Sequence, residues 1–428
     1  DEDCGDFLPW LERKAGAKIS SVFSIGKSGY GRSLFASKVI RAGDCILKVP
    51  FDMQISVDNL LPEIKSSLSD DVGNTAKLAI VVLTEQKLAQ SSDWAPYISC
   101  LPQPGEMHST IFWNEGELEM IRQSSVYQET INEKAQIQKK FLSICPALEL
   151  LPEIFEGVTF EDFIHAYAIV GSRAWGSSKG LTLIPFADFM NHDGASEAIV
   201  LSDEDKQLSE VIADHDYSPG EEVLIRYGKY SNATLLLDFG FMLPYNVYDQ
   251  VQIQLDIPHH DLLRDMKLKF LHEHCTRSMK GVNHFDSSEG SFTVKEVKSA
   301  RGKGKGLTSA LRAFARVLCC RSPEELNDLV MEAAQNDGRM AIRPLRNSDR
   351  EIQAHQILSS QFTQLIGGYY ASVKLLRPIN SPSICNTSDI RRQMARDLLT
   401  GKLCILKSAS TWVKNYCSTL IDTDYPQQ

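Results

Sequence analysis

The order of apolar and polar positions along the chain predicts four segments of different structure. Residues 19–55 carry short alternating and β-branched runs interrupted by glycine, which is typical of strands. Apolar residues then recur at helical spacing over about 56–168, most clearly in NTAKLAIVVLTEQKLAQ. Strands are predicted again over 181–227, and the pattern beyond about residue 255 is mostly helical to the C-terminus. Together these segments predict an α+β protein.

Length and charge narrow the classes of protein that fit this pattern. A chain of 428 residues is long enough for two or three domains. Its formal net charge of −10 argues against a general nucleic-acid binder, which needs lysine and arginine to displace counterions from phosphates. No apolar run approaches the roughly 18 residues that indicate a membrane-spanning helix. We therefore expect a globular protein with no membrane and no direct nucleic-acid binding.

The ten cysteines are scattered along the chain, and none belongs to a C-x-x-C pair. Such spacing is typical of reduced structural thiols inside a cell rather than of a zinc site. The segment LHEHC, with His272, His274 and Cys275, has no second cluster of ligands elsewhere in the sequence. We interpret it as a polar helix end, and we expect no metal.

The segment GKSGYGRS, residues 26–33, differs from a phosphate-binding P-loop by having arginine in place of lysine. A P-loop opens into a helix, whose N-terminal amides face the phosphates. Here the glycines lead into LFASKVI, which the pattern predicts to be a strand. Gly29 and Gly31 therefore indicate either a plain hairpin turn or a place where the backbone comes close to a ligand.

A second group of candidate residues belongs to or follows two apolar runs. Asn191 and His192 follow LIPFADFM and offer directional hydrogen bonds, either to a ligand or to buried neighbours. Asp188 lies within that run, where a carboxylate either caps a strand end or faces a site. Tyr227 ends the run VLIRY, so its ring either packs in the core or presents the phenol to a site.

Five segments in a fixed order carry a resemblance to a known family. They are the glycine segment followed by SRAW (172–175), IPFADFMNH (184–192), GEEVLIRYG (220–228) and SNATLLLDFGF (231–241). This series resembles the SET-domain methyltransferases, and most closely the plant branch named after the Rubisco large-subunit lysine methyltransferase. WAPYISCLP and STIFW also match segments that this branch carries in a helical insertion. The resemblance covers nearly the whole chain.

The resemblance implies a fold and a division into domains. It implies a SET-domain β fold at residues 1–250, with a pseudoknot in which the segment after Asn191-His192 passes under a loop of chain. The insertion at about 56–168 is expected to be helical. Residues 251–428 are expected to form an all-α substrate-binding domain of the Rubisco-methyltransferase type.

The resemblance also implies S-adenosylmethionine as the cofactor and methyl transfer to a lysine side chain as the reaction. It places Tyr227 at the catalytic position, with its phenol oxygen facing the methyl donor and the lysine nitrogen. Substrate contacts are expected from Arg173, Asp188 and Phe239. The residues expected to bind the cofactor are Ser28, Gly29, Tyr30, Gly31, Arg173, Asn191, His192, Tyr227 and Phe241.

Two positions depart from the family pattern. Ser28 stands where the family's glycine loop often carries an acidic residue, which removes one polar contact to the cofactor. Phe239 stands where relatives usually have tyrosine, which bears on the number of methyl groups added. These departures support an alternative, a catalytically weak or inactive scaffold subunit of a larger assembly, whereas the intact Tyr227 and Asn191-His192 favour an enzyme. A further alternative is methylation of a histidine or another nitrogen, which occurs among animal relatives.

The expected partner is a protein substrate with an exposed lysine, for which Rubisco large subunit and aldolase are family precedents. The resemblance, together with a first residue other than methionine, suggests the chloroplast stroma and allows a larger plastid assembly. Two basic segments offer surfaces for an acidic partner, although such charges more commonly belong to a solvated surface. They are KSARGKGKG (298–306), which we expect to be a mobile loop, and the group Arg391, Arg392 and Arg396.

Overall fold

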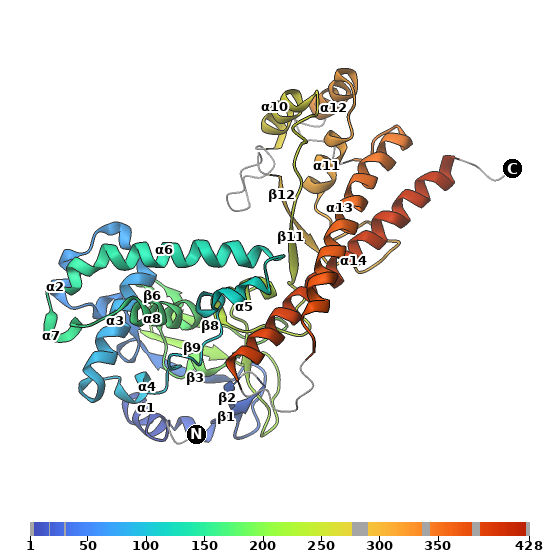
Figure 1. Cartoon of the computed structure of the whole chain (residues 1–428). Coiled ribbons are helices and arrows are strands. Elements are labelled where there is room, and N and C mark those ends of the chain that lie inside the picture. The colour runs from blue at the N-terminus through green and yellow to red at the C-terminus, as the bar shows by residue number, and fades with distance from the viewer. Residues whose placement is uncertain are drawn as a thin grey trace. The chain divides into compact units, whose positions relative to one another are not determined.

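The computed structural model describes residues 4–16, 18–29, 31–275, 290–335, 343–378 and 386–424. Contacts divide the chain into two compact units. The first unit is Asp1–Leu118 with Val126–Val247, and the second is Glu119–Ser125 with Tyr248–Gln428. Figure 1 traces both from the N-terminus in blue to the C-terminus in red. None of the helices in the described part of the chain is both long and apolar enough to cross a bilayer.

Short strands form several small sheets in the first unit. They are β1 (Phe23–Ser28), β2 (Gly31–Ala36), β3 (Cys45–Pro50), β4 (Ile55–Ser56), β5 (Trp175–Ser177), β6 (Gly180–Leu183), β7 (Asn191–His192), β8 (Val200–Asp203), β9 (Leu208–Ile212) and β10 (Leu224–Ile225). β1 pairs with β2, two three-stranded sheets have the orders β3-β9-β8 and β4-β6-β5, and β7 pairs in parallel with β10. The strands predicted over 19–55 and 181–227 are confirmed.

Helices occupy the segment between these two groups of strands. They are α2 (Pro62–Ser67), α3 (Asn74–Leu88), α4 (Ala95–Ile98), α5 (Glu115–Glu119), α6 (Ser125–Leu148), α7 (Pro152–Phe155) and α8 (Phe160–Arg173), with α1 (Phe7–Ala15) before and α9 (Asn232–Thr234) after the strands. Every residue of α3 from Leu78 to Glu85 is buried. A helix that is apolar around most of its circumference belongs in a core, and α3 packs against α8 there. The predicted helical segment is confirmed.

A capping box starts α8, the helix that ends at Arg173. The Thr159 hydroxyl accepts the Asp162 amide at 3.3 Å, and the Asp162 carboxylate accepts the Thr159 amide at 3.0 Å. The two bonds satisfy backbone donors that the first helical turn leaves without partners. The buried face of α8, which includes Phe163 and Ile169, then fixes the rotation of the helix about its axis. The cap fixes where α8 begins and the buried face fixes its rotation, so together they determine the position of Arg173 at its C-terminus.

The second unit is mainly helical. It contains β11 (Gln250–Gln254), β12 (Ser291–Lys295), α10 (Arg264–Cys275), α11 (Ser309–Leu318), α12 (Pro323–Gln335), α13 (Ser348–Leu375) and α14 (Thr387–Asp424). The Ser322 hydroxyl accepts the Glu325 amide at 3.2 Å, which is the helix start that SPEE predicts. The antiparallel pair β11–β12 was not predicted, because each strand is defined by a partner distant in sequence.

A buried ion pair joins two helices of the second unit. Arg316 on α11 donates to Glu351 on α13 at 2.7 and 3.0 Å, and each side chain is 1% exposed. The carboxylate also accepts bonds from the Tyr416 hydroxyl at 2.9 Å and the Leu345 amide at 3.0 Å. Burial alone would raise the pKa of Glu351, but the Arg316 guanidinium outweighs burial and lowers it.

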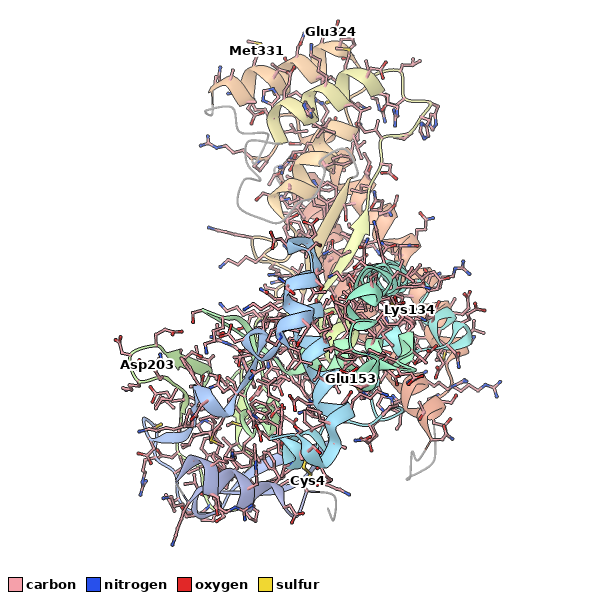
Figure 2. All side chains as sticks on the ribbon, turned by 90° about the vertical axis from the view of Figure 1, so that its left-hand side faces the viewer. Cys4, Lys134, Glu153, Asp203, Glu324 and Met331 are labelled. Atoms are coloured by element: carbon pink, nitrogen blue, oxygen red, sulfur yellow. A yellow bond between two sulfur atoms is a disulfide. The ribbon has the colours of Figure 1, made fainter. Side chains whose placement is uncertain are left out.

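We predict that Glu351→Gln lowers the free energy of unfolding by about 3–5 kcal/mol, because it leaves Arg316 buried without a counter-charge. Because the pKa of Glu351 is lowered from 4.5, the wild-type contribution is present above about pH 4.5 and is lost as the pH falls further. Guanidinium denaturation followed by circular dichroism measures the difference. Glu324→Gln is the matched control, since Glu324 is exposed on α12 and labelled in Figure 2. Similar small losses in both variants would contradict the assignment.

Candidate active site

The glycine segment forms the tight turn between β1 and β2, in which Ser28 pairs with Gly31. Gly31 has φ +97°, a backbone conformation that glycine adopts without steric cost. A Cβ added at Gly29 or at Gly31 would meet no atom within 4 Å, so this backbone has open space beside it. Tyr30 lies outside the described residues. The hairpin is therefore observed, and the close approach of a ligand stays a prediction.

Asn191 brings this hairpin to the strand pair β7–β10. Its Nδ2 donates to Ser28 Oγ at 3.2 Å and to Glu222 Oε1 at 3.3 Å. These bonds use both amide hydrogens, so Asn191 presents its carbonyl oxygen as an acceptor. Glu222 was missed by the sequence analysis, since a carboxylate in GEEVLIRYG cannot be distinguished from a solvated surface charge.

His192 packs behind Asn191 and faces Tyr227. The Tyr227 backbone amide donates to His192 Nδ1 at 3.0 Å, and burial lowers the pKa of the imidazole. A neutral ring that accepts at Nδ1 carries its proton at Nε2. His192 Nε2 is buried and has no hydrogen-bond partner among the residues that the structure describes. The ring therefore offers one unused N–H donor to a ligand.

Tyr227 lies in an aromatic group at the end of β10. Its ring centroid is 5.0 Å from that of His192, 5.5 Å from Phe239 and 6.3 Å from Phe241. The phenol donates to the carbonyl of Met190. Burial raises the pKa of Tyr227, so the phenol stays protonated at neutral pH. Its oxygen and the Met190 carbonyl thus form a pair of acceptors among apolar rings.

Asp188 is the centre of a second cluster of buried polar side chains. Its Oδ2 accepts the Tyr97 hydroxyl at 2.7 Å and Arg173 Nη1 at 3.1 Å, while Oδ1 is buried and has no partner in the described part of the chain. Burial raises the pKa of Asp188, and the Arg173 guanidinium opposes that change. Tyr97 was missed by the sequence analysis, although it lies in the quoted segment WAPYISCLP. The free oxygen is an acceptor for a ligand donor or cation.

The short turn that carries Asp188 is held in a strained conformation. Phe186 has φ +77°, which is rare for a residue with a side chain and costs about 1–3 kcal/mol. Phe186 is fully buried, and the ring of Phe7 from α1 stacks on Phe189 with centroids 4.9 Å apart. The surrounding aromatic packing therefore stabilises the strained backbone at Phe186. No feature of the segment IPFADFM predicted this conformation.

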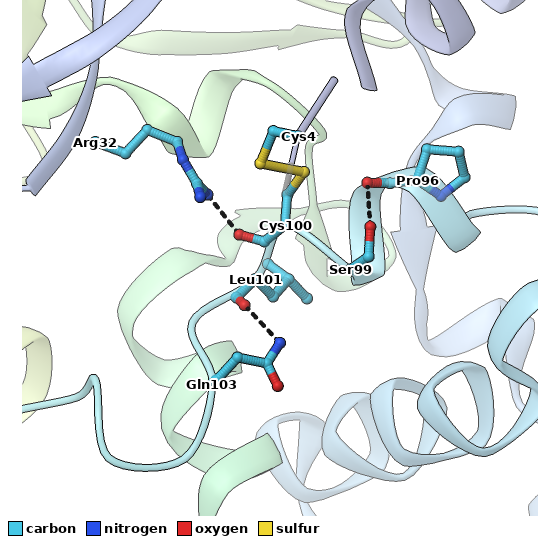
Figure 3. The surroundings of a disulfide bond; sticks show 7 residues. All are labelled: Cys4, Arg32, Pro96, Ser99, Cys100, Leu101 and Gln103. Carbon is cyan, nitrogen blue, oxygen red and sulfur yellow. Dashed lines mark hydrogen bonds between the residues drawn. A yellow bond between two sulfur atoms is a disulfide. The ribbon is translucent and has the colours of Figure 1, made fainter. Parts of the chain in front are cut away.

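A disulfide lies beside the glycine hairpin (Figure 3). The expectation of reduced thiols is wrong for Cys4 and Cys100, which are bonded across a sequence separation of 96 residues with Cα atoms 5.6 Å apart. The carbonyl of Cys100 accepts a hydrogen bond from Arg32 Nη1 on β2 at 2.5 Å. The pairing depends on the approach of α1 to α4, so spacing along the chain could not reveal it.

The structure thus brings the sequence-predicted residues into one region. Ser28 contacts Asn191, Tyr227 contacts His192, and the backbone joins Asp188 to Asn191 through Met190. The region combines an unused buried donor, an unused buried acceptor and a group of aromatic rings. No group of three or more histidine, cysteine, aspartate or glutamate side chains is placed to hold a metal among the described residues. Such a site suits an organic ligand with both polar and apolar parts.

Comparisons with known proteins agree with this geometry. The family model described as "SET domain" matches residues 31–228. The chloroplastic fructose-bisphosphate aldolase lysine N-methyltransferase of Arabidopsis thaliana is 27% identical over 68% of this chain and 61% of that protein. The chloroplastic Rubisco large-subunit N-methyltransferase of Pisum sativum is 30% identical over 61% of this chain and 56% of that protein. The actin-histidine N-methyltransferase of Homo sapiens is 24% identical over 94% of this chain and 67% of that protein.

Solved structures share the fold along the whole chain. The SET domain of LSMT bound to lysine and AdoHcy superposes with a TM-score of 0.73 at 20% identity, covering 98% of this chain and 93% of that one. Rubisco LSMT bound to AdoMet gives 0.72 at 21% identity, covering 99% and 94%. Fold and site together define a SET-domain protein. Residues 31–228 match the SET domain, and the chain is similar in fold to the Rubisco large-subunit methyltransferase structures, while its alignments span less than two thirds of the length of the two plant relatives.

We predict that His192 contributes to the pH dependence of stability in the first unit. Because its pKa is lowered from 6.5, the unfolded chain takes up a proton before the folded one does. The free energy of unfolding should therefore fall as the pH drops below about 6.5, and His192→Gln should flatten part of that fall. Denaturation curves between neutral and mildly acidic pH measure it. The remaining fall belongs in part to His165, whose pKa burial also lowers.

The control for this prediction is His259→Gln, because His259 is exposed and takes part in no ion pair between described residues. It should leave the fall in stability as steep as in the wild type. If His192→Gln and His259→Gln gave the same pH profile, the buried environment assigned to His192 would be contradicted.

Proposed function

We propose that this protein is an S-adenosylmethionine-dependent methyltransferase that acts on a lysine side chain of a protein substrate. The single observation that carries the proposal is the convergence of the glycine hairpin, Asn191-His192 and Tyr227 through direct hydrogen bonds. The SET-domain match supports methyl transfer, and a plant relative named as a lysine N-methyltransferase supports lysine as the target.

The residues present fit the cofactor. S-adenosylmethionine supplies an electrophilic methyl group on a sulfonium sulfur, and it also carries an ammonium, a carboxylate and an adenine. The free Asp188 Oδ1 suits a cationic or N–H group, while Arg173 and the unused His192 N–H suit an acceptor. The other residues proposed to hold the cofactor are Ser28, Gly29, Tyr30, Gly31, Asn191 and Phe241.

The aromatic group around Tyr227 suits the lysine amine. Only a neutral amine has the lone pair that attacks the methyl carbon. Apolar rings such as Phe239 disfavour the ammonium form by desolvation. The lysine therefore gives its proton to water before its amine binds among these rings. The Tyr227 oxygen and the Met190 carbonyl then accept the N–H bonds and aim the lone pair. Positioning of this kind supplies a large part of a methyltransferase's rate.

Phe239 touches the same rings but carries no hydroxyl. Its centroid lies 5.4 Å from that of Tyr230 and 5.5 Å from that of Tyr227. A methylated amine needs room rather than a further hydrogen-bond partner as its hydrogens are replaced. We therefore expect more than one methyl group per lysine, which intact-mass analysis of the product measures.

A histidine nitrogen is the second candidate acceptor. The actin-histidine methyltransferases of human and chicken align over 94% and 96% of this chain, farther than the two plant lysine methyltransferases. An imidazole nitrogen also attacks as the neutral base, so the dry aromatic site accommodates either acceptor. The plant relatives point to a plastid substrate and to the chloroplast stroma, with the Rubisco large subunit or aldolase as first substrates to test.

The experiment that tests the function has two stages. Calorimetric titration of the purified chain with S-adenosylmethionine measures cofactor binding. Incubation with a soluble plant extract and methyl-labelled cofactor, followed by fragment-ion mass spectrometry, then identifies the modified residue type. Methyl-lysine supports the proposal, methyl-histidine supports the second candidate, and binding without transfer supports the scaffold alternative.

We predict that Tyr227→Phe lowers the rate of methyl transfer by roughly a hundredfold, because it removes the phenol oxygen that orients the amine. Cofactor affinity should persist, since the backbone amide that holds His192 is unchanged. Single-turnover kinetics and the calorimetric titration separate these two quantities. Tyr245→Phe is the matched control, because Tyr245 is 94% exposed, and it should leave both quantities unchanged. Loss of affinity without loss of rate would refute the assigned role.

A further inference from the structure

The loop between β12 and α11, residues 295–306 and here called the basic loop, carries an unusual density of positive charge. Its charged residues are one carboxylate, Glu296, and five exposed cations, Lys295, Lys298, Arg301, Lys303 and Lys305. No ion pair between described residues involves any of these five cations. The chain as a whole has a net charge of −10, so this loop is a locally positive region on a negatively charged protein.

The basic loop is fixed to α14, contrary to the expectation of a mobile segment. The Trp412 indole donates to the carbonyl of Gly302 at 2.8 Å, and the Val297 amide donates to Ser408 Oγ at 3.0 Å. Asn415 Nδ2 adds a bond to the carbonyl of Ala300 at 3.5 Å. Three side chains of one helix therefore hold the loop along its length, and its cations are presented on a supported backbone.

Gly304 shows how closely the basic loop lies on that helix. Its φ is +72°, and a Cβ added there would lie 2.7 Å from the Trp412 ring. Trp412 is 3% exposed, because the loop covers one face of its indole and Tyr416 stacks on it with centroids 5.0 Å apart. Arg312 approaches the same indole at 5.0 Å. The aromatic rings beneath the loop are thus occupied and offer no platform for a nucleic-acid base.

Two further cations extend the surface along α14. Lys407 precedes Ser408 and Lys414 precedes Asn415, so both belong to the helical turns that anchor the loop. Both lysines are exposed. Cations without an ion-pair partner among the described residues favour an anionic partner, and a loop whose backbone is anchored loses little conformational entropy when it binds.

We propose that the basic loop, with Lys407 and Lys414, is a docking surface for an acidic segment of the protein substrate. The inference rests on the proposed function, since it assigns the surface to substrate recruitment. A compact group of cations without exposed stacking rings matches a cluster of aspartate and glutamate better than a nucleic acid. Docking there binds the substrate through residues that take no part in methyl transfer, so it contributes to substrate affinity alone.

A fluorescein-labelled oligoglutamate peptide serves as the probe, and its fluorescence anisotropy during titration with the 428-residue chain is the readout. The test variant neutralises the centre of the loop with Lys298→Gln, Arg301→Gln, Lys303→Gln and Lys305→Gln together. The control variant makes the same charge change at exposed positions elsewhere, with Arg13→Gln, Lys65→Gln, Lys87→Gln and Lys139→Gln. We expect the test variant to lose affinity by about tenfold or more and the control by less than about threefold.

A third variant separates the shape of the loop from its charge. Trp412→Phe removes the indole bond to Gly302 while keeping a ring beneath the loop. It should weaken peptide binding by about threefold at unchanged charge, in proportion to one lost hydrogen bond. Thermal denaturation of each variant shows whether the second unit is folded.

Three results would overturn the docking proposal: no binding of the peptide by the wild type, equal losses in the two four-fold variants, or tighter binding of a single-stranded DNA probe of matched charge. Cofactor titration of the same preparations keeps the two proposals distinguishable. A chain that binds the peptide at the loop but never S-adenosylmethionine would refute the proposed function alone. Normal cofactor binding with no preference for the loop would refute the docking surface alone.

Discussion

The parallel pairing of Asn191–His192 with Leu224–Ile225 is the constraint on which the rest of the site depends. A pair of two-residue strands is weak by itself, so neighbouring bonds must hold it: the Asp193 amide donates to the Ile225 carbonyl at 2.9 Å, and the Arg226 amide donates to that of Ala198 at 2.8 Å. The segment around Ile225 thus runs between two stretches of one loop. This arrangement places Tyr227 against His192 and Asn191 against the glycine hairpin. Both contacts are positioned by short strands and not by a long helix or strand.

Incomplete hydrogen bonding is the chemical signature of the resulting site. Buried polar atoms in folded proteins nearly always have partners, yet His192 Nε2 and Asp188 Oδ1 have none among the described residues. Each unsatisfied atom costs roughly 1–3 kcal/mol, and the positive φ of Phe186 adds strain to the turn that carries Asp188. The surrounding packing of α1, α3 and α8 tolerates this cost. The same atoms become favourable contacts once a ligand supplies the complementary groups.

The sequence predicted most of the helices and strands, and its failures have a common physical cause. Hydrophobic periodicity located the hairpin, the helical segment around α3 and the long C-terminal helices, because each is set by local pattern. Tyr97 and Glu222 were missed because their roles come from partners 91 and 31 residues away, Asp188 and Asn191. The same holds for the Cys4–Cys100 disulfide, the β11–β12 pair and the anchoring of the basic loop by Trp412. Composition marked that loop as basic and glycine-rich, but only tertiary contacts decide whether such a segment is held.

The central claim is that the glycine hairpin and the strand end at Tyr227 enclose the same ligand. Hydrogen–deuterium exchange with and without S-adenosylhomocysteine tests this most directly, because it reads both segments in one experiment without any substrate. The account predicts that peptides covering 23–36, 187–193 and 223–228 gain protection together, over the same range of ligand concentration. Protection of Asn191 and Tyr227 peptides with an unchanged hairpin, or binding that protects none of the three, would contradict it.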